Sequence, residues 1–220
     1  PFHNQRSPAA LDLRRARQDT KHQLFRSMLQ RALKAGWTAA YALADAWFGC
    51  KENILCCLDN NLVGIFQMKR GNMAYQYQGH SCTAGQLYVK VQRRMRPKNR
   101  RARYKTASIT VSLNLQIDDR QPAHWIEVRL VFSAPVRASS ADTWVVFLCT
   151  DVTLSDAKIL ALYALRWSLE VYFKEIKQKL GFLKEQSGRY QLAYASVHLA
   201  ALRYVLLFEA MLRSGQLSYG

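Results

Sequence analysis

Helical and strand-like apolar patterns alternate along the first seventy residues, and this alternation constrains the fold more than any other feature. Apolar residues recur at helical spacing over about residues 13–35. A short apolar run at 39–44 has the length of a buried strand and ends in Asp45. A second helix is expected at about 51–58 and a second strand at about 62–69. Helices that alternate with buried strands predict an α/β domain.

The middle of the chain is strongly basic. Residues 60–117 contain no Asp or Glu but eleven Lys or Arg, and nine of these lie within residues 90–105. The whole chain has a formal net charge of +17 at pH 7, which favours a polyanionic partner such as nucleic acid. The alternative for this run is a solvated, flexible loop. The side chains expected to contact phosphates are Arg93, Arg94, Arg96, Lys98, Arg100, Arg101 and Arg103.

The remaining sequence predicts further strands and two helices. Alternating residues at 108–115 and 125–132 are typical of half-exposed antiparallel strands, and 143–149 is apolar on both faces. A long helix is expected at about 155–180 and a final one at about 192–213. The prediction is therefore an α/β core interrupted by a β-rich basic insertion, with core parts at 1–69 and 143–220 and the insertion at 70–142.

No membrane partner is expected, because the sequence has no unbroken run of 18 apolar residues. Five cysteines at spacings that fit no zinc site are typical of free thiols in a reducing cytosol. A cytoplasmic location follows from these two features.

The expected helix at 155–180 carries the residues best suited to chemistry. Tyr163, Arg166, Glu170 and Lys177 fall within roughly 60° of arc, with Lys174 beside them. A carboxylate can hold a divalent cation, while guanidinium, ammonium and phenol groups can bind phosphates. The alternative is a solvated amphipathic helix with spaced ion pairs. The adjoining stripe, expected to be buried, is Leu162, Leu165, Leu169, Phe173, Ile176 and Leu180.

Those four residues match a known signature. The spacing resembles the Y-(2)-R-(3)-E-(6)-K motif of the insertion-sequence transposases called the IS-four family, and residues 150–182 resemble that family's C-terminal catalytic block. Asp45, within ALADAWFG, is similar to the family's second acidic block. The resemblance covers about residues 15–210 and implies a ribonuclease-H-like fold acting in DNA transposition.

The resemblance also implies the site and its partners. Three acids would bind two Mg²⁺ or Mn²⁺ ions for cleavage and strand transfer, with Asp45 as the second acid and Glu170 as the third. The partners would be double-stranded DNA, as transposon ends and target, and a second copy of the chain in a synaptic homodimer associated with a bacterial nucleoid. The residues that would hold phosphates are Tyr163, Arg166, Lys174 and Lys177.

The first of the three acids has no counterpart. Asp12 and Asp19 are expected in a loop and a helix, whereas the family's first aspartate follows a strand. The chain is therefore expected to be N-terminally truncated and inactive alone. Asp151 is a third candidate for the missing acid, although its position favours an N-cap or turn residue.

Two tryptophans are candidates for stacking on a DNA base. Trp144, or Trp125, would stack a flipped base if the resemblance extends to the end of the insertion; the alternative is that either ring fills the β-rich core.

The rivals to a transposase are a non-catalytic basic nucleic-acid-binding module and a nuclease of the same fold.

Overall fold

The computed structural model describes residue 4 and residues 6–71, 73–120, 122–137, 143–184 and 189–215. The chain forms two compact units. One is Thr20–Leu165, and the other combines Pro1–Asp19 with Arg166–Gly220.

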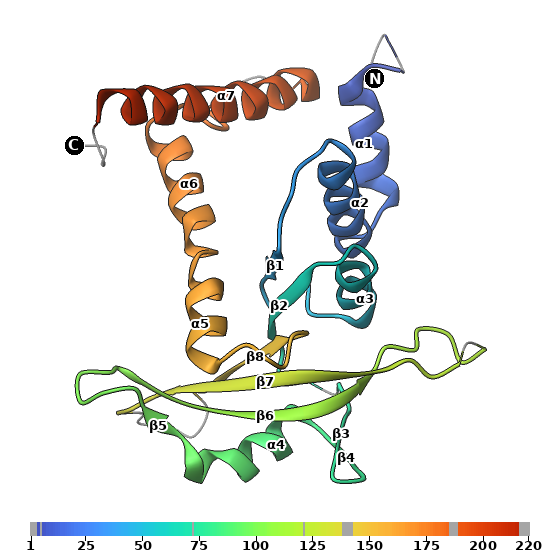
Figure 1. Cartoon of the computed structure of the whole chain (residues 1–220). Coiled ribbons are helices and arrows are strands. Elements are labelled where there is room, and N and C mark those ends of the chain that lie inside the picture. Colours follow the sequence, from blue (N-terminus) through green and yellow to red (C-terminus); the bar gives the residue numbers. More distant parts are fainter. Residues whose placement is uncertain are drawn as a thin grey trace. The chain divides into compact units, whose positions relative to one another are not determined.

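The Thr20–Leu165 unit is built on one eight-stranded mixed sheet with the order β1-β2-β8-β7-β6-β3-β4, in which β5 pairs with β6 (Figure 1). β1 and β2 are parallel, and every other pair is antiparallel. The strands are β1 (Tyr41–Ala44), β2 (Val63–Met68), β3 (Tyr75–Tyr77), β4 (His80–Cys82), β5 (Arg96–Pro97), β6 (Tyr104–Asn114), β7 (Trp125–Pro135) and β8 (Val145–Cys149).

The predicted α/β fold class is confirmed. Helix α2 (Lys21–Lys34), β1, helix α3 (Lys51–Asp59) and β2 follow one another as expected. The two predicted antiparallel strands are β6 and β7, which pair from Tyr104↔Pro135 to Asn114↔Trp125.

The prediction of a single helix over 13–35, with Asp12 in a loop before it, is wrong. The chain instead forms α1 (Pro8–Gln18) and then α2. Proline suits the first position of a helix, because its missing N–H would have no helical partner there. Thr20 begins α2 through a capping box, in which the Gln23 N–H donates to Thr20 Oγ1 at 3.3 Å and the Thr20 N–H to Gln23 Oε1 at 2.7 Å. Asp12 therefore lies in a helix and Asp19 in the following loop, the reverse of the expectation.

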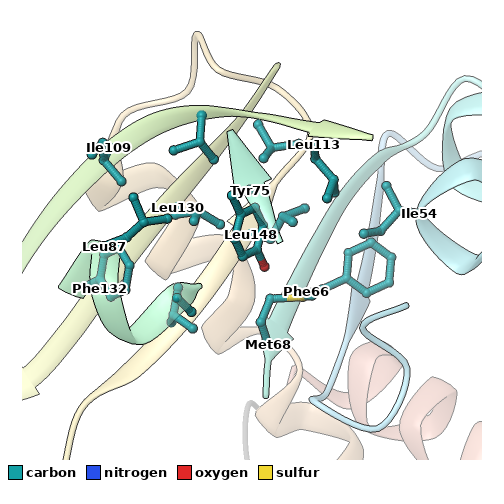
Figure 2. Close-up of a cluster of buried hydrophobic side chains, with 14 of the residues drawn as sticks. Ile54, Phe66, Met68, Tyr75, Leu87, Ile109, Leu113, Leu130, Phe132 and Leu148 are labelled. Atoms are coloured by element: carbon teal, nitrogen blue, oxygen red, sulfur yellow. The ribbon is translucent and has the colours of Figure 1, made fainter. Parts of the chain in front are cut away.

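Alternating residues of the strands bury side chains on both faces of the sheet. The larger cluster contains Phe66 of β2 and Leu148 of β8, which pack with Ile54 of α3 and Leu87 of helix α4 (Ala84–Val91) (Figure 2). The strands from the predicted insertion share this core and this sheet with β2, since Leu130 and Phe132 of β7 belong to the same cluster. The three-part domain division stays a prediction.

The opposite face of the sheet is covered by α5 (Asp156–Ala164). Ile159 and Leu162 of α5 pack against Ile65, Val131 and Phe147, which alternate with the residues of the larger cluster. Helix α5 is therefore fixed against the side of β2 that carries Ile65.

The predicted helix over 155–180 is wrong as one element, since it consists of α5 and α6 (Trp167–Gln178). Between them the N–H of Leu165 donates to Leu162 O at 3.0 Å, and the N–H of Leu169 donates to Arg166 O at 3.0 Å. These three-residue spacings are those of a tighter 3₁₀ turn. The predicted buried stripe is wrong in part: Leu162 and Ile176 are buried, whereas Leu165, Leu169 and Phe173 are exposed.

The other unit contains α1, α6 and α7 (Tyr190–Ser214). Tyr172 of α6 meets Tyr204 of α7 edge to face at a centroid distance of 4.8 Å. Among the described residues, α7 is the one helix long and apolar enough to cross a membrane, although it has no unbroken apolar run of 18 residues. Helices of soluble proteins meet the same criterion, so it does not assign α7 to a membrane.

Candidate functional site

Asp45 follows β1 at the carboxyl edge of the two parallel strands. The N–H of Trp47 donates to Asp45 Oδ1 at 2.9 Å, and the N–H of Phe48 donates to the Asp45 carbonyl at 3.0 Å. The turn then passes close to β2, because a Cβ on Gly49 would lie 2.7 Å from Met68 Sδ and 3.1 Å from Gln67 O. Glycine at this position therefore lets the turn pack against the end of β2.

Tyr163 is tied to the same edge. Its hydroxyl donates to Gln67 Oε1 at 3.2 Å, and its ring packs on Phe147 at a centroid distance of 4.6 Å. Ala44, the last residue of β1, pairs with Phe66 of β2, so Asp45 and Gln67 each follow directly after this pair. Asp45 and Tyr163 thus come from distant parts of the sequence to one strand edge. Sequence reasoning missed Gln67, for which a polar residue at the end of an apolar strand was the available signal.

Arg166 and Glu170 form an ion pair on the other unit, with Arg166 Nη2 and Glu170 Oε1 2.6 Å apart. The Glu170 side chain is 42% exposed, and Lys174 and Lys177 are also exposed on α6. The prediction that the side chains of Arg166 and Glu170 lie next to each other is therefore confirmed. That Tyr163 shares an arc with them stays a prediction, because Tyr163 belongs to α5.

The basic hairpin, residues 90–105, is built from the end of α4, η1 (Gln92–Arg94), β5, a turn and the start of β6. Buried Met95 attaches it to the core, and Arg96 Nη1 donates to the carbonyls of Arg93 and Met95 at 2.9 and 3.0 Å. The N–H of Arg101 donates to Asn99 Oδ1 at 3.0 Å in the turn. In the described part of the chain, no carboxylate lies within 4.0 Å of its nine cations. The seven predicted phosphate-binding residues, Arg93, Arg94, Arg96, Lys98, Arg100, Arg101 and Arg103, are all exposed.

A cavity of about 920 Å³ joins the hairpin to Tyr163. Its wall is mainly apolar and aromatic, with Tyr104, Phe147 and Tyr163, and the cations Lys98 and Arg103 also line it. The structure therefore places Tyr163 on the same cavity as Lys98 and Arg103, about sixty positions away in the sequence.

Trp144 lies in the core, as the alternative interpretation expected. It is 6% exposed, stacks on Tyr88 at a centroid distance of 4.5 Å, and has the Arg70 guanidinium 4.5 Å from its ring centroid. Arg70 Nη2 also donates to the Trp144 carbonyl. A base cannot stack on Trp144 in this arrangement, because its ring is covered by Tyr88 and Arg70. Trp125, by contrast, is exposed at the start of β7.

Asp151 is a turn residue. Its Oδ1 accepts hydrogen bonds from the Thr153 N–H at 2.8 Å and from the Thr153 hydroxyl at 2.6 Å, and these bonds lower the pKa of the Asp151 carboxyl. The N-cap of α5 is Ser155, which accepts from the Lys158 N–H at 3.3 Å.

Carboxylate oxygens are the ligands that Mg²⁺ prefers, and Asp45 and Glu170 both supply them. No group of three or more His, Cys, Asp or Glu side chains is placed to hold a metal ion within the ranges that the structure describes.

The family model for the transposase DDE domain matches residues 2–206. The chain belongs to this family. No curated protein matches it. Membership of the family implies a ribonuclease-H-like fold, and the mixed sheet with its flanking helices agrees with it. It also implies DNA as the substrate and divalent metal ions as cofactors.

Proposed function

We propose that this chain is the catalytic portion of a DNA transposase of the IS-four type, with Asp45 and Glu170 as metal ligands. The observation that carries the proposal is the position of Asp45 at the carboxyl edge of β1 and β2 in a transposase DDE domain. Ligands of α/β sheets bind at this edge, where loops converge on the strand ends.

Each residue has a distinct task in this proposal. The backbone N–H of Trp47 orients the Asp45 carboxylate, and Arg166 pairs with Glu170. Asp45 and Glu170 would hold the metal ions, while Arg166, Tyr163, Lys174 and Lys177 would bind phosphates. Two Mg²⁺ or Mn²⁺ ions, when bound, supply the activation of water or of a 3′-hydroxyl for attack on phosphorus.

The basic hairpin would bind phosphates of the DNA duplex. Its exposed cations release counterions from the duplex, which gives affinity that depends on salt and not on sequence. The double-stranded partners in this proposal are the transposon ends and the target, held by two copies of the chain.

A third carboxylate would complete the site. β1 ends the sheet in the described part of the chain, so its outer edge offers backbone groups to a further strand. A strand on that edge that ends in aspartate would bring the third carboxylate beside Asp45.

Iron-mediated cleavage of the protein tests the metal site without relying on DNA cleavage. Fe²⁺ bound in place of Mg²⁺ would cut the backbone near its ligands when ascorbate and peroxide are added. We expect cuts near residues 45 and 170 that excess Mg²⁺ suppresses and Asp45→Asn removes, while Asp151→Asn leaves them. Cuts that persist in Asp45→Asn would overturn the assignment.

A non-catalytic DNA-binding module is the second candidate, favoured by the basic hairpin alone. Such a module binds every duplex equally at one fixed salt concentration, whereas a transposase prefers the terminal repeats of its element. Equal affinity for the terminal-repeat and random duplexes would favour the module.

A further inference from the structure

Trp47 is an exposed aromatic residue next to the candidate catalytic carboxylate. It follows Asp45 by two positions and is 65% exposed. Lys69 Nζ lies 4.1 Å and Lys21 Nζ 5.5 Å from its ring centroid. These lysines come from the end of β2 and the start of α2, so three segments converge on one indole.

The backbone beneath Trp47 is fixed, although its ring is exposed. Its N–H is bonded to Asp45, and the next residue, Phe48, stacks on Phe25 of α2 at a centroid distance of 5.2 Å. The ring therefore projects from an anchored turn. Trp144, in contrast, is enclosed by the core and does not present its ring to solvent.

An exposed indole with two ammonium groups has the chemistry of a nucleotide-binding platform. Cation–π contacts at exposed sites are weak, and a lysine stem is flexible enough to move its ammonium from the ring to a nearby phosphate. A nucleobase stacks on an indole more strongly, and the displaced ammonium groups would then pair with the phosphates on either side.

We propose that Trp47, Lys21 and Lys69 bind an unpaired nucleotide of the DNA next to Asp45. The base must be unpaired, because bases within a duplex are already stacked on both faces and do not offer one to the protein. This inference rests on the proposed function for the identity of the substrate, and it adds a binding site for a single-stranded end or an extruded base.

A binding comparison between two DNA forms tests the platform. Fluorescence anisotropy would measure the affinity of the 220-residue chain for a blunt duplex and for the same duplex with a four-nucleotide overhang, in EDTA at one salt concentration. Trp47→Ala should weaken overhang binding about 5- to 100-fold and leave blunt-duplex binding within about twofold. Trp47→Phe should restore part of the loss.

Trp37 supplies the matched control. It is 75% exposed, and among the described residues no ammonium or guanidinium is found over its ring. Trp37→Ala should change neither affinity. Trp47→Leu repeats the test with apolar bulk but no aromatic face, if Trp47→Ala lowers the stability of the chain. In addition, 5-iododeoxyuridine in the overhang should crosslink to Trp47 on irradiation.

Two results would overturn the platform. One is an equal loss for blunt and overhang DNA in Trp47→Ala or Trp47→Leu; the other is no loss in either variant. Because EDTA removes metal ions, these measurements do not depend on the metal site. If the iron-mediated cuts do not appear but the chain binds the overhang as expected, the proposed catalytic function is wrong and the platform is not.

Discussion

Gly49 lets the turn after Asp45 pack against the end of β2, because it has no side chain. A Cβ at this position would overlap with Met68 Sδ, which is buried, and with the carbonyl of Gln67. Gly49→Ala should therefore lower the free energy of unfolding by about 1–3 kcal/mol, as overpacking does in cores. Urea unfolding would measure this change. The control is Gly85→Ala in α4, where the nearest atom to the new Cβ lies 3.9 Å away and alanine should stabilise the helix by up to about 1 kcal/mol.

Asp151 should stabilise the fold only while it is ionised. The Thr153 hydroxyl and N–H donate to its carboxylate and lower its pKa below the unfolded value of about 3.9. Its contribution is thus present above that pH and is lost as the pH falls through the lower, folded-state pKa. Asp151→Asn should therefore be less stable than the unmodified chain at pH 7, and the difference in unfolding free energy should vanish toward pH 2. A constant difference over this range would contradict the ionic origin.

Single residues were predictable where their role is local. Asp45 at a strand end and Asp151 in a turn follow from short stretches of sequence, because both roles depend on nearby backbone groups. The polar side chain of Gln67 at the end of an apolar strand is visible in the sequence, but its partner is not, since Tyr163 reaches it through the packing of α5 on the sheet. The sequence also left two roles for Trp144, stacking on a base or filling the core. Its burial depends on Tyr88 and Arg70, which come from other elements.

At the scale of elements, the break between α5 and α6 had no sequence signal. Residues 163–169 contain no Gly or Pro, and the backbone at Leu165 and Arg166 keeps right-handed helical dihedrals. Only the shift from four-residue to three-residue hydrogen bonds interrupts the helix. Periodicity detects the apolar spacing on both sides of such a turn but not the turn itself.

The exposed cations of the basic hairpin predict how strongly the binding of duplex DNA depends on salt. Arg100 and Arg101 are exposed in its turn, so replacing both by Gln should weaken binding to any duplex and reduce the slope of log K against log salt by about 1.8, or 0.9 for each lost phosphate contact. Arg31→Gln with Lys34→Gln removes the same charge from the exposed end of α2 and should leave the slope unchanged. Equal effects of the two double variants, measured by anisotropy over a salt series, would show that net charge rather than the hairpin binds DNA.

At the scale of the whole molecule, the strands were predictable but their order was not. Alternating patterns locate β6 and β7, because each strand buries one side of its own sequence. The order β1-β2-β8-β7-β6-β3-β4 depends on contacts between distant residues, such as Phe66 with Leu148. For the same reason, the predicted insertion gave no sign that its strands continue the sheet of the core. The division of the chain at Arg166 lies within a predicted helix and had no sequence signal either.

The last prediction separates DNA binding from DNA cleavage in the 220-residue chain. Two-metal chemistry needs enough carboxylates to hold both ions, and the proposed site has two, those of Asp45 and Glu170. We therefore expect the chain to bind a labelled duplex in EDTA but to cleave it only slowly with Mg²⁺ or Mn²⁺. Glu170→Gln should lower this residual rate by about a hundredfold or more, since a metal-held charge contributes several kcal/mol, and should change duplex affinity less than twofold. Asp45→Asn should behave in the same way, whereas Asp151→Asn should leave the rate unchanged. Rapid cleavage by the unmodified chain would mean that a third carboxylate already acts in it, and loss of that cleavage in Asp151→Asn would identify Asp151 as the third ligand.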